Sequence, residues 1–589
     1  MRMQTPSPSP SERLGDERMG HERAARERPA RDPAGSGSVT PSTWAWALAA
    51  ACTLLAPAAA RADVDLKFSG WISSDMRFRV LGEERAPPNP VPSQWSILKN
   101  GFSRNENRIR AALNLRIGDK IRGVADTELL LFGFSDLSDI DSTTLRNRVD
   151  PYYLEVHAAF IDINNLFGDV IPRFDLRIGR QTVPWGAADK FNPISNLNTL
   201  DLSDPLQFGR ALANNMIRAD WNPIGDLTFT AVLVPVFRPA QLPRTAPVAL
   251  LDPLRPAPVA NQGIRSALDD ERAIYVPLYD PVTGTYLPSG RTLTITADVL
   301  APEITASNMQ FGFRATTKVK DQDIGLSYYH GRFGIPVPAW SISTGTLDNN
   351  LTQTLLVYPK MDVLGLEMAG SIETLGGLGY WAEAAVIFPG EVGLAFYDGI
   401  TPGGVKPFQY SQNPATGSYF RDTKPPGTAA ADRPLVVEKT PFAKATVGID
   451  YNIKGRVYMN IQYVHGFIDE FGAGRAARPR TNAIDINEKP RVEARVGDYV
   501  VAGLDLKFLG DRLLLRLFGV VKLPSVDLTT RLWDDYAPTG VLFPQIAWTV
   551  WDATELSVGG FIMLGDRSTK FGDPAAGASE IFARARVSF

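Results

Sequence analysis

The sequence contains one cysteine and four histidines among its 589 residues. So few thiol and imidazole groups leave no disulfide framework and little material for a structural or catalytic metal site. Lys and Arg number 61 and Asp and Glu number 64, which gives a formal net charge of −3. This balance lacks the basic excess of nucleic-acid-binding proteins. We therefore expect no cofactor and no nucleic-acid partner.

Long apolar runs are also absent after Ala62, so no transmembrane helix is expected in the mature chain. One shorter apolar run, "TWAWALAAACTLLAPAAARA", covers residues 43–62 and ends in Ala60-Arg61-Ala62. An apolar core followed by this small-residue pattern is typical of a secretory signal peptide. We predict cleavage after Ala62, which removes Cys52. Export without a transmembrane helix leaves the periplasm, the cell exterior or the outer membrane of a Gram-negative cell.

Residues 1–42 are rich in Pro, Arg, Glu and Ser and show no apolar periodicity. Such a composition predicts a disordered leader. The leader is longer than a normal signal-peptide amino-terminal region, which favours a later start, for example at Met19. The predicted organisation is a leader over 1–42, a signal peptide over 43–62 and one domain over 63–589.

What the mature chain does contain is apolar and polar residues in alternation. In "VDLKFSGWISSDMRFRV" the residues Leu66, Phe68 and Ile72 share one face, while Asp75 and Arg77 share the other. This period of two predicts a β-strand with one apolar and one polar face. Similar stretches follow in pairs, and each pair is joined by a short turn of Gly, Asn or Asp, the residues that tight turns favour.

Longer Pro-, Gly- and Asp-rich segments separate these pairs. Nine long segments and eight short turns give eighteen strands, with sixteen as the alternative, and both chain ends lie on the side of the short turns. Short periplasmic turns, long extracellular loops and an even strand number are typical of bacterial outer-membrane barrels. We predict an all-β fold, a transmembrane antiparallel up-and-down β-barrel. The long segments are approximately 81–104, 133–150, 182–214, 237–307, 333–360, 389–440, 468–496, 524–539 and 565–578.

The sequence ends on a strand, "EIFARARVSF", with Phe589 as its last residue. In lipid every backbone amide must be paired, so a sheet has to close on itself. The first and last strands are therefore expected to pair with each other. A terminal aromatic residue resembles the closing strand of outer-membrane barrels, which the barrel-assembly machinery reads, and Phe589 is expected at the membrane interface.

The predicted inner face carries many charged residues. A soluble β-sandwich predicts a dry core, which does not hold so many charges, so the pattern favours a water-filled lumen. Arginine is concentrated on the first three strands and on the last strand, which adjoins them after closure. The predicted pore-lining residues are Arg77, Arg79, Arg108, Arg110, Arg116, Arg122, Asp126, Glu128, Arg177, Arg584 and Arg586.

Two interpretations of these arginines remain open. In one, guanidinium groups attract anionic solutes and give the channel selectivity. In the other, arginines and interleaved carboxylates pair across strands and line a wet channel with little preference. The interleaving of acids with the arginines favours the second interpretation.

The stretch "FDLRIGRQTVPWGAADKFNPISNLNTLDL" (174–202) is the most distinctive in the chain. It resembles the strand and loop of a broad, poorly characterised group of outer-membrane porin-like and alginate-export-like proteins. The resemblance implies an outer-membrane channel without a specified substrate. The second part of this stretch begins the third long segment (182–214). In many porins the third long loop folds into the pore. Candidate constriction residues there are Trp185, Asp189, Asn192 and Asp201, although an ordinary surface loop fits equally well.

Together these patterns predict an outer-membrane channel for passive diffusion of small hydrophilic solutes, with anionic solutes as a candidate class. The alternatives are an exporter of an acidic polysaccharide, a structural or sheath barrel, and an adhesin. No nucleophile or phosphate-binding motif is recognisable, so no enzymatic activity is expected. Expected partners are outer-membrane lipid, small solutes and the barrel-assembly machinery, and both a monomer and a homo-trimer remain open.

Overall fold

The computed structural model describes most of the segment that follows the predicted signal peptide. The predicted leader (1–42) and signal peptide (43–62) lie outside the described residues. The described residues are 64–80, 100–135, 140–243, 271–280, 285–345, 349–390, 395–398, 435–436, 441–471, 474–478, 491–494, 496–524, 538–565, 569–572 and 577–589.

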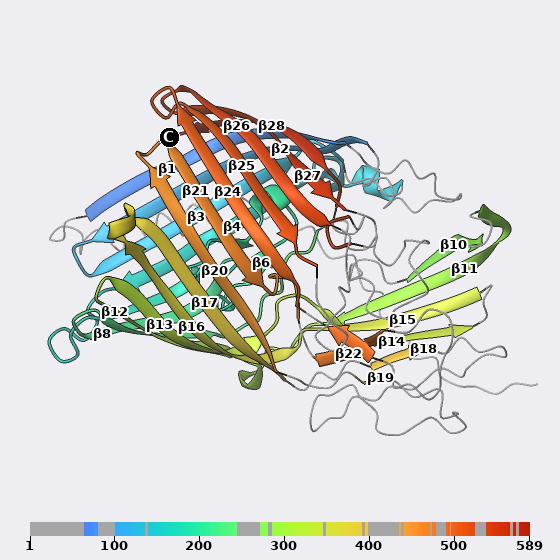
Figure 1. Cartoon of the computed structure of the whole chain (residues 1–589), viewed down its shortest axis with the longest axis horizontal. Coiled ribbons are helices and arrows are strands. Elements are labelled where there is room, and N and C mark those ends of the chain that lie inside the picture. Colours follow the sequence, from blue (N-terminus) through green and yellow to red (C-terminus); the bar gives the residue numbers. More distant parts are fainter. Residues whose placement is uncertain are drawn as a thin grey trace, which may run out of the picture. The chain divides into compact units, whose positions relative to one another are not determined.

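Eighteen antiparallel strands form one closed sheet, in which each strand pairs with the next barrel strand along the chain and β28 pairs back to β1 (Figure 1). The predicted eighteen-stranded barrel is confirmed. Its strands are β1 (Val64–Arg79), β2 (Gly101–Ile117), β3 (Ile121–Phe132), β4 (Tyr152–Ile163), β5 (Phe174–Gln181), β8 (Asn214–Ile224), β9 (Leu227–Val234), β12 (Gln310–Val319), β13 (Gln322–Arg332), β16 (Lys360–Ile372), β17 (Leu378–Pro389), β20 (Phe442–Ile453), β21 (Val457–His465), β24 (Asp498–Phe508), β25 (Leu513–Lys522), β26 (Thr539–Trp551), β27 (Thr554–Leu564) and β28 (Glu580–Ser588).

The segments predicted as loops contain further short elements. The strands β10, β11, β15, β14, β18 and β19 form a six-stranded sheet in that order, and β6–β7 and β22–β23 are two-stranded. No helix among the described residues is both long and apolar enough to cross a bilayer. These elements are β6 (Leu200–Asp201), β7 (Arg210–Ala211), β10 (Glu271–Asp280), β11 (Thr285–Leu300), β14 (Val337–Gly345), β15 (Asn349–Val357), β18 (Ala395–Asp398), β19 (Leu435–Val436), β22 (Gly474–Arg478), β23 (Arg491–Ala494), η2 (Asp141–Thr144), α2 (Arg146–Val149), η3 (Pro205–Gln207), η4 (Ala306–Asn308) and η5 (Glu373–Leu375).

The junction between the first and last strands closes the barrel. The register runs from Trp71 opposite Ser588 to Arg79 opposite Glu580. Beyond it, Phe589 and Gly70 exchange two backbone hydrogen bonds of 2.9 Å, and the Phe589 ring stacks on Phe68 with centroids 5.6 Å apart. The terminal residue is therefore part of the sheet, as closure of the ladder requires.

The outer wall of the barrel is an apolar band between two rings of aromatic residues. At the short-turn end the exposed aromatics include Phe68, Trp221, Phe229, Phe508, Trp548, Trp551 and Phe589. At the long-loop end they include Phe78, Phe102, Tyr152, Phe313, Phe388 and Tyr463. Phe78 follows Phe68 by ten positions in β1, and at the usual strand tilt this length covers about 25 Å of membrane normal. That height matches the apolar band of outer-membrane barrels.

Candidate functional site: the lumen and its loop

The third long segment, residues 182–213, lies inside the barrel, and we call it the lumen loop. It leaves β5 and returns to β8, and between them it contacts inward-facing side chains of several strands. On β17 and β20, Glu383 accepts hydrogen bonds from the Ala188 N–H and from Asn192 Nδ2 (3.1 Å), and Thr446 donates to the Phe191 carbonyl at 2.7 Å. The lumen loop therefore contacts wall strands that lie far from it along the chain.

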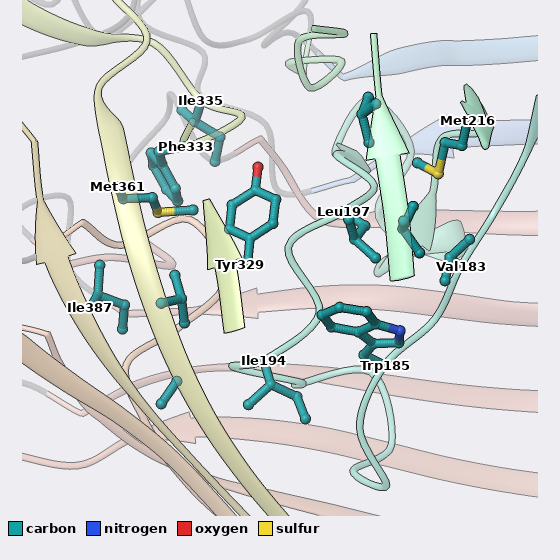
Figure 2. Packing of buried hydrophobic residues seen from close by; sticks show 14 residues of the cluster. Val183, Trp185, Ile194, Leu197, Met216, Tyr329, Phe333, Ile335, Met361 and Ile387 are labelled. Atoms are coloured by element: carbon teal, nitrogen blue, oxygen red, sulfur yellow. The ribbon is translucent and has the colours of Figure 1, made fainter. Parts of the chain in front are cut away.

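Apolar packing holds much of the lumen loop against the wall (Figure 2). Trp185, Ile194 and Leu197 are each at most 3% exposed and pack in one cluster with Tyr329 and Met361. A second cluster joins Phe191 to wall and loop residues, among them Val464, Phe467, Tyr499, Val501, Val520, Val541 and Phe571. Part of the lumen is thus a dry, packed core. The sequence had indicated a water-filled pore rather than a plugged lumen, and this part differs from that expectation.

Each candidate constriction residue has a definite position. Trp185 is buried in the first apolar cluster, and Asn192 reaches Glu383 as described above. The Asp189 carbonyl accepts a hydrogen bond from Gln462 Nε2 at 3.2 Å, and its carboxylate lies 3.4 Å from Asn460 Nδ2. Asp201 pairs with Arg210 and fixes the Ser203 N–H at 2.9 Å. The segment is packed inside the barrel and is not an ordinary surface loop.

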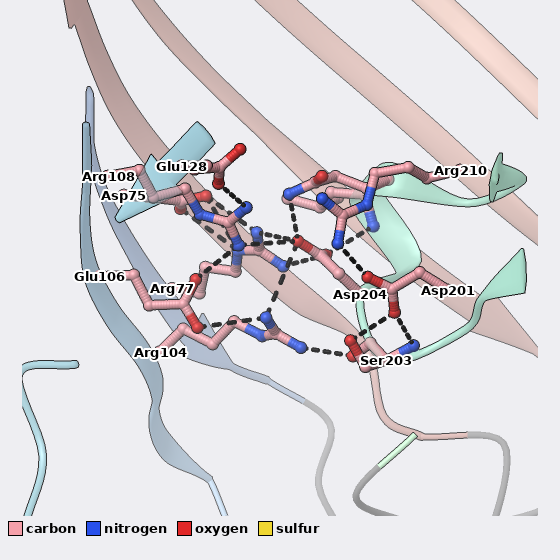
Figure 3. Close-up of polar contacts among 12 residues, drawn as sticks. Asp75, Arg77, Arg104, Glu106, Arg108, Glu128, Asp201, Ser203, Asp204 and Arg210 are labelled. Atoms are coloured by element: carbon pink, nitrogen blue, oxygen red, sulfur yellow. Dashed lines mark hydrogen bonds and ion pairs between the residues drawn. The ribbon is translucent and has the colours of Figure 1, made fainter. Parts of the chain in front are cut away.

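Two of the predicted arginines, Arg77 and Arg108, meet the lumen loop in one network of charges, together with Arg104, which was not among the predicted residues (Figure 3). Arg77 is at its centre and is 1% exposed. It contacts Asp75 at 2.8 Å and forms two bonds to Asp204 of the lumen loop, at 2.6 and 2.9 Å. We call the following eight residues the charge cluster: Asp75, Arg77, Arg104, Glu106, Arg108, Glu128, Asp204 and Arg584.

Every arginine in the charge cluster contacts at least one of its carboxylates. Arg108 bonds to Glu106 at 2.8 Å and to Glu128 at 3.1 Å, and Arg584 bonds to Asp75 at 2.7 Å. Charge-assisted pairs of this kind are the strong ones. Protein carboxylates therefore already bind the guanidinium groups of this cluster.

Other predicted pore-lining residues form separate pairs along the inner face. Arg110 and Asp126 bond at 2.6 and 2.8 Å, Arg177 pairs with Asp162, and Arg122 donates to Asn114 at 3.1 Å. These pairs extend the alternation of charges from the cluster toward the short-turn end. At the long-loop end, Arg79 lies 3.9 Å from Glu580, which lies equally far from Arg77 of the charge cluster.

Two predicted arginines stay outside this pairing. Arg586 stacks over the Trp71 ring with its guanidinium carbon 4.7 Å from the centroid, and Arg116 has an exposed side chain. Neither forms an ion pair within the described part of the chain. Arg116 lines a polar chamber at the short-turn end, whose other charged lining residues are Asp119, Arg122, Asp162, Asp175, Arg177 and Asp220.

A further contact set that the sequence did not reveal lies in the segments at the long-loop end. Lys570 donates to Asp469 at 2.6 Å and to Glu470 at 3.1 Å, and Tyr499 also donates to Glu470. Burial alone would raise the pKa of Glu470, but the Lys570 charge and the Tyr499 hydroxyl lower it to about 2. We call this set the loop latch, because it joins segments that follow β21 and β27.

The three histidines that follow residue 62, His157, His330 and His465, each contact a carboxylate of their own. His157 bonds to Glu128 at 2.9 Å, and His330 and His465 each contact an aspartate at 2.8 Å at the long-loop ends of their strands. Across the described ranges no group of three or more His, Cys, Asp or Glu side chains is arranged to hold a metal ion.

Comparisons with known proteins give one family match and several solved structures. Residues 141–427 match the family described as "Protein of unknown function (DUF1302)". No curated protein matches the sequence. OpdL from Pseudomonas aeruginosa has 11% identity and a TM-score of 0.41 over 89% of this chain and 98% of its own. OccAB3 from Acinetobacter baumannii has 10% identity and a TM-score of 0.40, over 89% and 99%.

The outer membrane protein OpdK from Pseudomonas aeruginosa has 9% identity and a TM-score of 0.40, over 89% of this chain and 99% of its own. The closed ladder, the aromatic rings and the charged inner face come from the coordinates of this chain itself. The chain is thus a closed, eighteen-stranded antiparallel barrel, and its residues 141–427 match a family model of unknown function.

Proposed function

We propose that this protein is an outer-membrane channel for passive diffusion of small hydrophilic solutes. The observation that carries the proposal is the charged inner face of a closed barrel whose outer face is apolar. Such an inner face is stable only in contact with water or with compensating charge. Here charges of both signs run from the charge cluster to the polar chamber at the short-turn end.

Solute size would be limited by the lumen loop. The loop lies between the charge cluster on one wall and the apolar clusters on the other. Anchoring residues on both sides support a fixed constriction rather than a mobile lid. Trp185, Asp189, Asn192 and Asp201 then act by holding the loop in place.

The paired arginines support weak ion selectivity in the native channel. A guanidinium that already binds carboxylates has little remaining attraction for a passing anion. Among the predicted pore-lining arginines, Arg116 and Arg586 lie outside the pairs and are the first candidates for an anion preference. We expect a reversal potential close to zero in a salt gradient.

Planar-bilayer recording of the purified, refolded protein tests the proposal. Discrete current steps would support the channel. A bilayer that stays silent, with barrel folding verified by a mobility shift on unboiled gels, would contradict it and favour the sheath or adhesin alternative.

A further inference from the structure

Asp204 occupies a special position in the charge cluster. Seven members of the cluster lie on the wall strands β1, β2, β3 and β28, whereas Asp204 belongs to the lumen loop. It is 2% exposed and lies directly before η3. The lumen loop therefore places the negative charge of Asp204 against the wall strands.

Both carboxylate oxygens of Asp204 are engaged by guanidinium groups. Arg77 makes the two bonds given above, and Arg104 and Arg108 approach to 3.7 and 3.6 Å. One carboxylate thus serves three guanidiniums from two strands (Figure 3). Burial alone would raise the pKa of Asp204, but these arginines, Arg77 first, hold it well below its ordinary value.

The position of Asp204 is set by its own segment as well as by the arginines. Its Oδ1 caps η3 by accepting the Leu206 N–H at 3.0 Å, and its Oδ2 accepts from Gln207 Nε2 at 3.0 Å. An amide side chain keeps an oxygen that accepts such a capping bond. An asparagine at this position can therefore preserve the local turn while removing the charge.

The charge cluster contains four guanidinium groups and four carboxylates, so its formal charge is zero. Removing Asp204 leaves one positive charge in a poorly solvated part of the wall, where a charge acts over a longer distance than in water. The edge of this region reaches the solvent through Arg110 and Arg584, whose side chains are 35% and 27% exposed.

From this geometry we propose that Asp204 determines the ion preference of the channel by neutralising the arginines of β1 and β2. The inference rests on the proposed channel function. In the native chain, small anions such as chloride, carboxylates or phosphate gain nothing from these arginines. Without the Asp204 carboxylate, the same arginines attract them.

The test is the reversal potential of wild-type and Asp204→Asn channels in a potassium chloride gradient. We expect the anion-to-cation permeability ratio of the variant to rise about two- to fivefold, as one added charge near a pore predicts. Asp552→Asn is the matched control, because it removes one carboxylate from the exposed turn between β26 and β27, where its ion pair with Arg512 (3.8 Å) lies in water. A ratio that does not change in Asp204→Asn, or that rises equally in both variants, would overturn the proposal.

A second pair of variants separates charge from displacement of the loop. Arg77→Gln alone leaves the cluster with one excess carboxylate and should shift the preference toward cations. Adding Asp204→Asn to Arg77→Gln restores zero charge and should return the reversal potential to the wild-type value. Failure to return would contradict the proposal, and this pair gives an answer even if Asp204→Asn alone does not assemble. Wild-type protein that gives no discrete current steps would instead contradict the proposed channel function.

Discussion

At the scale of single residues, Glu383 is the main polar anchor of the lumen loop on the wall opposite the charge cluster. It is 2% exposed and binds the loop through Ala188 and Asn192. Gly186 makes this approach possible, since its φ is +97° and a Cβ there would lie 2.3 Å from Glu383 Oε1. The loop reaches the carboxylate because the backbone at Gly186 carries no side chain.

Replacing Glu383 with Ala should loosen the lumen loop. A buried hydrogen bond contributes about 0.5–1.5 kcal/mol, so losing two of them shifts the balance of docked and undocked loop about five- to 150-fold toward undocking. We expect larger and noisier single-channel currents in planar bilayers. Glu373→Ala, in the exposed turn η5, is the control and should leave the currents unchanged. Quiet, wild-type currents in Glu383→Ala would show that the loop is held without this anchor.

The loop latch predicts a pH dependence of stability. Because the pKa of Glu470 is lowered from 4.5 to about 2 in the folded state, the latch stabilises the fold fully above about pH 4.5 and loses this contribution as the pH falls toward 2. The contribution at neutral pH is on the order of 3 kcal/mol. Thermal unfolding of wild-type and Glu470→Gln protein in detergent should therefore differ at pH 7 and converge near pH 2. A difference that persists undiminished at pH 2 would contradict the role of this carboxylate.

At the scale of elements, alternation of apolar and polar residues was sufficient to predict the barrel strands. The turn residues located the short connections, and the need for a closed ladder predicted that β28 pairs with β1. Strand alternation and turn residues are local features, and closure of the ladder follows from the lipid environment. A single sequence is therefore enough to predict all three.

The interior of the barrel was less predictable. Asp204 and Arg77 are 127 positions apart, and no local pattern joins them. One feature of the sequence does indicate where the lumen loop packs. Inward positions near the long-loop ends, such as Tyr329, Met361 and Val363, are apolar where a wet lumen predicts polar residues. That loss of alternation marks the part of the wall against which the lumen loop packs.

The closing junction gives a prediction for assembly. A Cβ on Gly70 would lie 2.3 Å from the Arg110 carbonyl oxygen and 2.7 Å from the Phe589 ring. Gly70→Val should therefore reduce the yield of heat-modifiable, folded barrel in the membrane fraction. Gly123→Val is the matched control on β3, where an added Cβ meets only Leu115 Cβ at 4.0 Å. Equal yields of the two variants would show that close packing at the junction is not required.

At the scale of the whole molecule, the barrel has one face toward lipid and one toward the lumen. The same strands that expose Ile109 and Leu113 on one face carry Arg108 and Arg110 on the other. Exposed aliphatic side chains are stable against hydrocarbon, and the paired charges are stable against water. A shift of one residue in register would exchange the two faces.

The two faces of β2 offer the most direct measurement. Neighbouring single-cysteine variants, Leu113→Cys and Asn114→Cys, are made in a chain that carries Cys52→Ala and are reconstituted in lipid vesicles. A charged, water-soluble thiol reagent should label position 114 and spare position 113, and a lipid-borne quencher should act on a fluorophore at 113 alone. Labelling of position 113 from water together with quenching at position 114 would contradict the barrel described here.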